Sequence, residues 1–223
     1  MMSRAEAFVV ARAIVRVLAD STHTEEIHWV EEITGRGPYR RLLAERAGDP
    51  QLQGLLRERP ELSPATVALD ELRALPGSTL GGAYVRHLDD NGLTPSSQAA
   101  DTRYVSEPDI AYLMRRFRRT HDIWHALLGL GITGHEEVLL HAFSWGQLRL
   151  PVSALVVVFG TLKHIVIERR WQTLRHSLYE AYQLGRDAAP LLPVPWETLW
   201  SEPIDDLRTR YHLRTCNPVH IHG

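Results

Sequence analysis

Residues 121–137 contain four polar side chains whose types and spacing suit a metal ion. His121 and His125 are four residues apart, so on a helix they project from one face, with about 5 to 6 Å between their Cβ atoms. Asp122 follows the first histidine, and Glu137 follows the second after eleven intervening residues. Imidazole and carboxylate together suit Zn²⁺, and also Fe²⁺ or Mn²⁺, with Mg²⁺ as a further alternative. The sequence therefore predicts a divalent metal site, above all for Zn²⁺, bound by these four residues.

The two carboxylates have alternative roles in such a site. Two histidines and two carboxylates could close a tetrahedral site around the ion. If one carboxylate only hydrogen-bonds to a ligand, a position stays open for water or substrate, which is the catalytic arrangement. Asp122 and Glu137 could then move protons, so they are the candidate catalytic residues. His141 lies one turn beyond Glu137 on the same helical face. The alternative is a hydrogen-bonded helical pair that binds no metal.

Two consecutive helices should position these residues. Ser106 can cap the first helix, and Gly129 should end it. Apolar side chains and the first histidine recur every three or four residues along it, at Ile110, Met114, Phe117, His121, Trp124 and Leu128. Thr133 followed by Glu136 predicts a capping box for the second helix. The short connection predicts that the two helices are adjacent and antiparallel, with the metal site between them.

The rest of the chain also has helical spacing. Strict alternation of apolar and polar residues is scarce, which predicts an all-α protein. With 223 residues, of which 44% are hydrophobic, we expect a single helical domain over residues 1–223. Gly35 and Gly37 should separate two N-terminal helices, and Ser63-Pro64 should begin another helix.

An apolar segment from Leu150 to Leu162 follows the two metal-binding helices. It is well short of the roughly 20 residues that span a bilayer, so it predicts a buried or interfacial helix. Its position suggests an apolar slot for a lipid tail, and an ordinary core helix is the alternative. Gly81 and Gly82 indicate close helix packing, with room for a ligand as the alternative.

Charge and cysteine content argue against several classes of protein. The formal net charge is −2 and the pI is about 6.6, which speaks against nucleic-acid binding. The arginines within residues 115–119 are expected on solvated faces. Cys216 is the single cysteine, so a disulfide framework is absent and the chain reads as intracellular. The first twenty residues lack the uninterrupted apolar core of a secretory signal.

The spacing His-Asp-x-x-His, eleven residues and then Glu resembles the zinc-ligand signature of the coenzyme Q biosynthesis protein 4 family. Residues 121–137 match it without a gap. Three longer segments are also similar to the family: LPGSTLGGAYVRHLDDNG at 75–92, DIAYLMRRFRRTHDIWHALLGL at 109–130 and GRDAAPLLPVPWE at 185–197. The resemblance covers about residues 56–213. His141 stands where many members have Lys, so a role of that Lys does not carry over.

The resemblance implies an all-helical protein of ubiquinone biosynthesis that binds prenylated aromatic precursors. The family is assigned the replacement of the ring carboxylate of a prenylated hydroxybenzoate, by decarboxylation with hydroxylation at the same carbon. His121, His125 and Glu137 are then the expected ligands, with Asp122 as fourth ligand or base. Expected partners are an isoprenoid lipid, other quinone-biosynthesis enzymes and a second copy in a homodimer. The expected location is the bacterial cytoplasm, with peripheral contact at the inner face of the membrane.

Two other classes of function remain as alternatives. One is a non-catalytic scaffold that binds prenyl lipids and organises the biosynthetic enzymes, with a structural metal. The other is a metal phosphohydrolase of the HD type, because His121-Asp122 is also the doublet of that class. Those enzymes need a further upstream His and a downstream Asp, for which His87 and Asp187 are poor fits.

Overall fold

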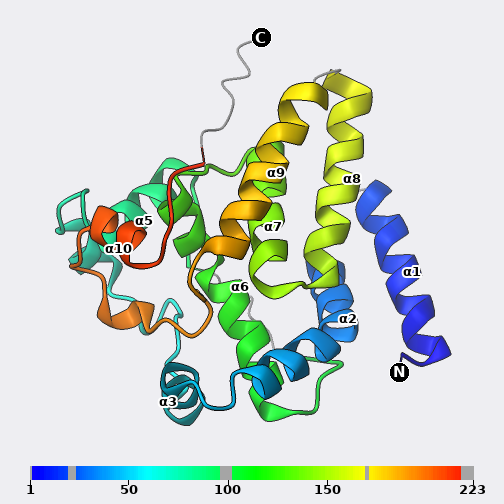
Figure 1. Cartoon of the computed structure of the whole chain (residues 1–223), viewed down its shortest axis with the longest axis horizontal. Helices are drawn as coiled ribbons and strands as arrows, with labels where there is room; N and C mark the ends of the chain where they lie inside the picture. Colours follow the sequence, from blue (N-terminus) through cyan, green and yellow to red (C-terminus); the bar gives the residue numbers. More distant parts are fainter. Residues whose placement is uncertain (1, 20–23, 96–101, 169–170, 217–223) are drawn as a thin grey trace.

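The computed structural model describes residues 2–19, 24–95, 102–168 and 171–216. Within these ranges the chain is helical, and its one strand-like pairing is an isolated bridge between Thr79 and Pro203. In chain order the helices (Figure 1) are α1 (Arg4–Ala19), α2 (Thr24–Glu45), α3 (Pro50–Glu58), α4 (Leu69–Arg73), α5 (Leu80–Asp90), α6 (Pro108–Leu128), α7 (Gly134–Leu148), α8 (Pro151–Glu168), α9 (Trp171–Asp187), the 3₁₀ helix η1 (Trp196–Thr198) and α10 (Ile204–Arg210). The all-α prediction is confirmed for the described part of the chain.

Helix α7 is central to one group of helices. It packs along α8 and α9, and α2 packs against α8. Helix α1 lies against α2 at the outside of this group (Figure 1). Helix α6 packs against α5 and α2, and its side chains meet those of α7, as Trp124 meets Phe143. Helix α6 therefore connects α5 to the group formed by α2, α7, α8 and α9.

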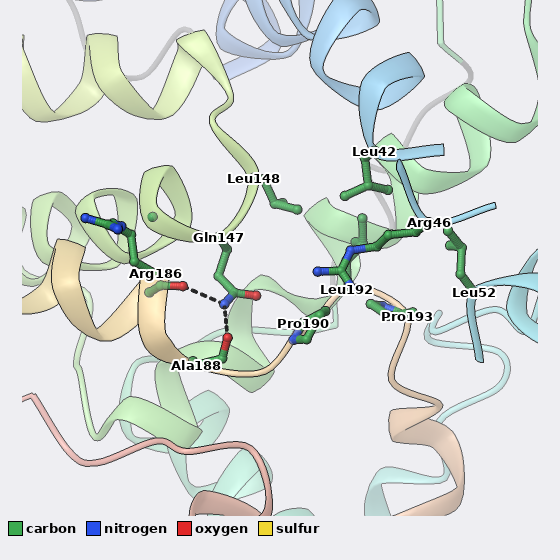
Figure 2. Close-up of a pocket in the computed structure, with 12 residues that line it drawn as sticks. Leu42, Arg46, Leu52, Gln147, Leu148, Arg186, Ala188, Pro190, Leu192 and Pro193 are labelled. Carbon is green, nitrogen blue, oxygen red and sulfur yellow. Dashed lines mark hydrogen bonds between the residues drawn. The ribbon is translucent and has the colours of Figure 1, made fainter. Parts of the chain in front are cut away.

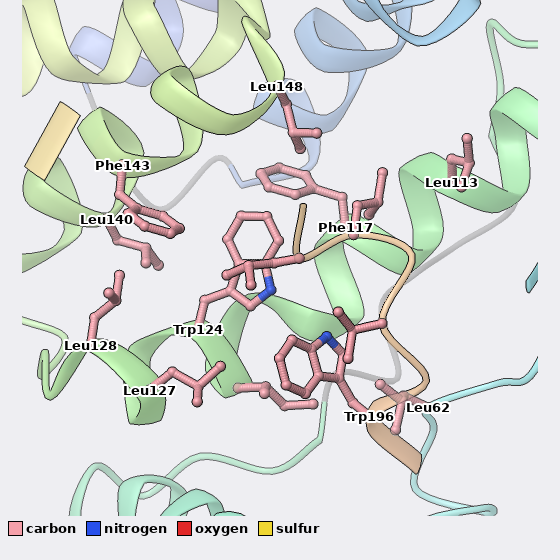
Figure 3. Packing of buried hydrophobic residues seen from close by; sticks show 14 of the residues in the cluster. Leu62, Leu113, Phe117, Trp124, Leu127, Leu128, Leu140, Phe143, Leu148 and Trp196 are labelled. Atoms are coloured by element: carbon pink, nitrogen blue, oxygen red, sulfur yellow. The ribbon is translucent and has the colours of Figure 1, made fainter. Parts of the chain in front are cut away.

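Two tryptophans fill the core beside α6 (Figure 3). Trp124 and Trp196 are each completely buried. The Trp124 ring meets Phe117 and Phe143 edge-on, with ring centroids 5.5 and 5.8 Å apart. Burying a side chain of this size stabilises the fold by roughly 3 kcal/mol or more relative to exposure. This packing fixes the rotation of α6, so that His125, the next residue, is also fully buried.

The predicted break between two N-terminal helices is wrong. Helix α2 runs without interruption through Gly35, Gly37 and Pro38. In a helix interior each glycine costs about 1 kcal/mol and a proline about 3 kcal/mol relative to alanine. Helix α2 nevertheless packs on α1, α6 and α8, and it buries Tyr39 almost completely just after the proline. Tertiary burial therefore outweighs the local preference to stop.

Two predicted helix starts are also wrong, and one is confirmed. Ser63 and Pro64 form a turn, in which the Thr66 hydroxyl donates to the Glu61 carbonyl, and the next helix begins only at α4. Helix α6 starts with no side-chain cap, so Ser106 does not cap it. The capping box at the start of α7 is present as predicted, and the Thr79 side chain caps α5.

Two arginines of α6 are buried, contrary to the prediction of solvated faces. Arg116 donates to the Val194 carbonyl at 2.6 Å and to the Glu197 carboxylate at 3.0 Å. Arg118 pairs with Glu31 and Glu32 of α2 at 2.7 and 3.1 Å. Buried charges need such partners, because an unpaired buried ion is strongly destabilising. Helix α6 is thereby connected to α2 on one side, and to η1 and the segment before it on the other.

Glycines permit the closest helix contacts. A Cβ added to Gly146 or Gly185 would overlap the backbone of the opposite helix, so α7 and α9 can approach this closely only without those side chains. Gly82 similarly backs onto the Pro76 carbonyl. The Gly81-Gly82 pair therefore marks close packing, but mainly against the turn before α5 and the backbone at Trp200 rather than against another helix.

The apolar segment 150–162 forms most of α8. Among the described residues, no helix is both long enough and apolar enough to cross a membrane.

Candidate metal centre

The two histidines of α6 share one face at the C-terminal end of that helix. Gly129 ends the helix in the left-handed conformation (φ 66°), and its N–H bonds back to the last turn. The His121 side chain is 24% exposed and the His125 side chain is fully buried. Their rings meet with centroids 4.7 Å apart at an interplanar angle of 66°. The i, i+4 spacing therefore brings both imidazoles together, as predicted.

The capping box at the start of α7 places Glu137. The Glu136 carboxylate accepts from the backbone N–H groups of Gly131 and Thr133, at 2.8 and 3.2 Å. This turn directs the next side chain, Glu137, back toward α6. Its Oε1 lies 3.4 Å from His125 Nε2 and its Oε2 lies 3.8 Å from His121 Nε2. The carboxylate thus faces both imidazoles.

His121, His125 and Glu137 form a group that could hold a metal ion. One ligand atom from each lies within 4.8 Å of the others. Neither ring nitrogen of His125 has a hydrogen-bond partner in the described structure, although the side chain is fully buried. Orphaned buried nitrogens are destabilising unless something binds them. The donor set, and the lack of hydrogen bonds to these nitrogens, fit a divalent ion that prefers nitrogen and oxygen ligands.

The electrostatics of the group favour charge separation between Glu137 and the imidazoles. Burial alone would raise the pKa of Glu137, but neighbouring His125 and His121 outweigh it and lower that pKa to about 2. Burial opposes protonation of His121, yet Asp122 and Glu137 together raise its pKa above the ordinary value. Glu137 is therefore an anion at neutral pH, which suits a ligand better than a proton donor.

Asp122 lies on the other edge of the His121 ring. Its Oδ1 is 3.7 Å from His121 Nδ1, whereas His121 Nε2 faces Glu137. Asp122 stands outside the compact group of three. A carboxylate at Nδ1 with Nε2 directed inward is the usual arrangement by which an outer residue orients a metal-binding histidine.

Two further histidines border the group. His87 of α5 stacks on His125, with ring centroids 5.0 Å apart, and its buried Nε2 has no hydrogen-bond partner within the described residues. His141 has its ring centroid 5.9 Å from that of His121, and its Nδ1 lies 3.4 Å from Ser153 Oγ. The spacing of His141 from Glu137 indicated this position in the sequence. No local signal indicated His87, because it reaches the site only through the packing of α5 on α6.

The structure does not assemble the residues expected of a phosphohydrolase. His87 lies beside the site, but Asp187 is exposed at the end of α9, where it lines a surface cavity with His212 and Arg214.

A separate cavity lies between the end of α2, α7 and the segment after α9 (Figure 2). Arg46 and Arg186 line it, and the Gln147 amide donates to the carbonyls of Gly185 and Ala188. None of the predicted site residues borders it. Gln147 also accepts from Leu191 N–H, so it ties the segment after α9 to α7.

The fold and the side-chain cluster define an all-helical protein with a candidate histidine and carboxylate metal centre on α6 and α7. The chain belongs to the family described as coenzyme Q (ubiquinone) biosynthesis protein Coq4, whose family model matches residues 2–217.

Individual relatives agree with this assignment. The chain is 32% identical over 209 residues to the mitochondrial ubiquinone biosynthesis protein COQ4 homologue of Drosophila ananassae, covering 94% of this chain and 78% of that protein. It is 35% identical over 163 residues to the COQ4 protein of Yarrowia lipolytica, covering 72% and 60%. A crystal structure of a Nostoc punctiforme protein assigned to ubiquinone biosynthesis superposes with a TM-score of 0.72 at 25% identity, covering 91% of this chain and 95% of that one.

Proposed function

We propose that this protein carries out a metal-dependent step of ubiquinone biosynthesis, in which the ring carboxylate of a prenylated hydroxybenzoate is replaced by a hydroxyl group. The family assignment supports the pathway. The observation that carries the metal dependence is the convergence of His121, His125 and Glu137, together with the lack of a hydrogen-bond partner from the described residues for either nitrogen of the buried His125. Zn²⁺ suits this donor set, and Fe²⁺ or Mn²⁺ suits it as well.

The proposed reaction breaks the bond between the ring and the carboxylate carbon, which leaves as CO₂, and forms a ring carbon–oxygen bond. With water as the oxygen source, one carboxylate and one water give a phenol, CO₂, one proton and two electrons. The two electrons must pass to an external oxidant of the dioxygen class. A bound ion would supply Lewis-acid stabilisation of the substrate carboxylate or phenolate. In this proposal Glu137 serves as a ligand, and Asp122, which lies beside His121, accepts a proton.

An apolar groove supports binding of the prenyl tail. It lies between α1, α2 and α8 and is lined by Ala13, Ile14, Ile27, Val30, Val152, Leu155, Val156 and Phe159. Its exposed surface is almost entirely apolar, and Val15 and Val158 nearby are 65% and 60% exposed. Exposed apolar side chains around an apolar groove favour a lipid ligand or a membrane surface. We therefore propose this groove as the slot for a lipid tail that was expected along residues 150–162.

Helix α8 separates the groove from the metal centre. Val152 and Phe159 line the groove. The residues that follow them face α7: Ser153 contacts His141, and Gly160 lies so close to Val138 that a Cβ would overlap it. A substrate with its ring at the metal centre and its tail along the groove would thus contact the two sides of one helix.

The test combines metal analysis with product formation. Protein purified without chelator should contain close to one equivalent of a divalent metal, and His125→Ala and Glu137→Gln should remove it. In bacterial cells that lack the endogenous protein, wild type should restore ubiquinone and both variants should not. His176→Gln is the matched control, because that side chain is 76% exposed on α9.

A scaffold without catalysis would give a different result. If His125→Ala lost its metal, still bound the other quinone-biosynthesis enzymes and still restored ubiquinone, the catalytic proposal would be refuted. If the variant assembled normally but the decarboxylation substrate accumulated, the proposal would stand.

A further inference from the structure

We propose that His141 is a fourth protein ligand of the ion, so that the centre has a donor set of three histidines and one glutamate, and the substrate would bind as a fifth ligand. The inference rests on the metal dependence proposed above and extends it to a residue outside the predicted ligand set. It is carried by the position of His141 on α7, the orientation of its ring and its contact with Ser153.

The first argument is the pairing of ligands on two helices. His121 and His125 are four residues apart on α6, and Glu137 and His141 are four residues apart on α7. On a helix, this spacing puts two side chains on one face, one turn apart. Glu137 faces both imidazoles of α6. The α7 face that carries Glu137 toward the ion therefore also carries His141.

The second argument is the arrangement of the rings. From metal–nitrogen bonds of about 2.0 Å and tetrahedral angles, two imidazoles that share one ion should have centroids about 5 Å apart. The centroid separations are 4.7 Å for His121 with His125 and 5.9 Å for His121 with His141, so His141 lies outside the compact group of three and would move toward the ion on binding. The interplanar angles are 66° and 50°, so the ring planes cross. Imidazole binds an ion in its ring plane, and crossing planes allow both rings to point at one ion.

His87 provides the contrast. It is as close to His125 as the other rings are to each other, but it is stacked on that ring at an interplanar angle of 16°. Stacked rings present their faces to one another, so their in-plane lone pairs do not meet. His87 is therefore a neighbour of the centre and not a ligand in this arrangement.

The third argument is the hydrogen-bonding partner of His141. Ser153 on α8 is fully buried, and its Oγ lies 3.4 Å from His141 Nδ1. With Nδ1 directed to the hydroxyl, Nε2 is left to bind the ion. Metal-binding histidines commonly have their second nitrogen held in this way. Ser153 would hold His141 as Asp122 holds His121.

A donor set with three imidazoles has a consequence for the metal. Nitrogen ligands favour Zn²⁺, Fe²⁺ and Co²⁺, whereas Mg²⁺ prefers oxygen ligands and retains water. This chain should therefore bind Co²⁺ in the presence of a large excess of Mg²⁺.

The experiment is a Co²⁺ titration of the apo-protein, followed by visible absorption, with Mg²⁺ present. The variants are His141→Gln, Ser153→Ala, Glu137→Gln and the exposed control His176→Gln. We expect His141→Gln to weaken Co²⁺ binding at least ~10-fold, by analogy with the loss of an orienting residue, and to shift the ligand-field bands. Ser153→Ala should weaken it less, and His176→Gln should have no effect. Circular dichroism verifies folding, and Ser153→Ala tests the proposal if His141→Gln unfolds.

The outcomes separate the two proposals. If Glu137→Gln abolishes Co²⁺ binding while His141→Gln and Ser153→Ala leave both affinity and spectrum unchanged, the role of His141 is refuted and the metal centre stands. If the wild-type protein binds no Co²⁺, Zn²⁺ or Fe²⁺, both proposals fail.

Discussion

At the residue scale, buried imidazoles surround the candidate centre, and several of their nitrogens lack a hydrogen bond within the described part of the chain that would offset the cost of burial. His87 places Nε2 in the interior without a partner among the described residues, and burial together with His125 lowers its pKa. A buried polar atom left unsatisfied costs about 1–3 kcal/mol. Its neighbours His121, His125 and His141 are the proposed ligands of an ion, whereas His87 only stacks on His125.

His87→Phe should therefore raise the free energy of unfolding, by about 1 kcal/mol, because a ring of similar shape replaces an unsatisfied polar group. Urea unfolding would measure the change. A loss of more than 1 kcal/mol would show that the imidazole has a partner in solution, such as an ordered water.

His28 gives a pH dependence to stability. Burial, and then the charge of Arg118, lower its pKa from 6.5 to about 4, so in the folded protein it stays neutral over a range where the unfolded chain takes up a proton. The contribution of neutral His28 to the free energy of unfolding is complete above about pH 6.5. It is lost as the pH falls toward 4, which lowers the free energy of unfolding by up to about 3 kcal/mol.

His28→Gln should flatten that part of the stability profile, measured by urea unfolding between pH 4 and 7. Glu31, whose pKa burial raises, also contacts Arg118, so the comparison is made against wild type at each pH. The exposed His176→Gln control should keep the wild-type slope. If the slope is unchanged in His28→Gln, the pH dependence of stability comes from other groups.

At the element scale, the position of α7 depends on its contact with α9. Gly185→Ala should destabilise the protein by about 1–3 kcal/mol, because the new methyl overlaps the Phe143 carbonyl and the helices must separate. Gly37→Ala is the matched control, since nothing lies within 4 Å of a Cβ there and α2 is helical at that point. It should be neutral or stabilising. The unfolding temperatures of the two variants are compared with that of wild type. Equal changes in both variants would contradict the predicted close contact between α7 and α9.

Local signals predicted part of this arrangement correctly. The capping box at Thr133 and the i, i+4 histidines depend on neighbours in sequence, so the start of α7 and the meeting of Glu137 with His121 and His125 could be predicted. The continuity of α2 through Pro38 could not, because packing against α1, α6 and α8 decides it. Burial of charged side chains and the approach of α5 to α6 depend likewise on distant segments.

At the scale of the whole molecule, a bound ion should stabilise the fold by mass action. Free ion at 100 times its dissociation constant contributes about 2.7 kcal/mol when it binds only the folded state. Zn²⁺ should therefore raise the unfolding temperature of the apo-protein, and His125→Ala should abolish the increase. Scanning calorimetry with and without Zn²⁺ would show this, and an equal increase in the variant would place the binding elsewhere.

Ser153 and Gly160 meet α7 from the same helix whose Val152 and Phe159 line the apolar groove. A rigid helix cannot adjust one of these sides alone, so a ligand that shifts α8 also shifts Ser153 against His141. If tail and ion each favour one position of α8, their affinities become linked, and the factor by which either strengthens the other is the same in both directions. Lipid occupancy would then set how firmly the protein retains its metal.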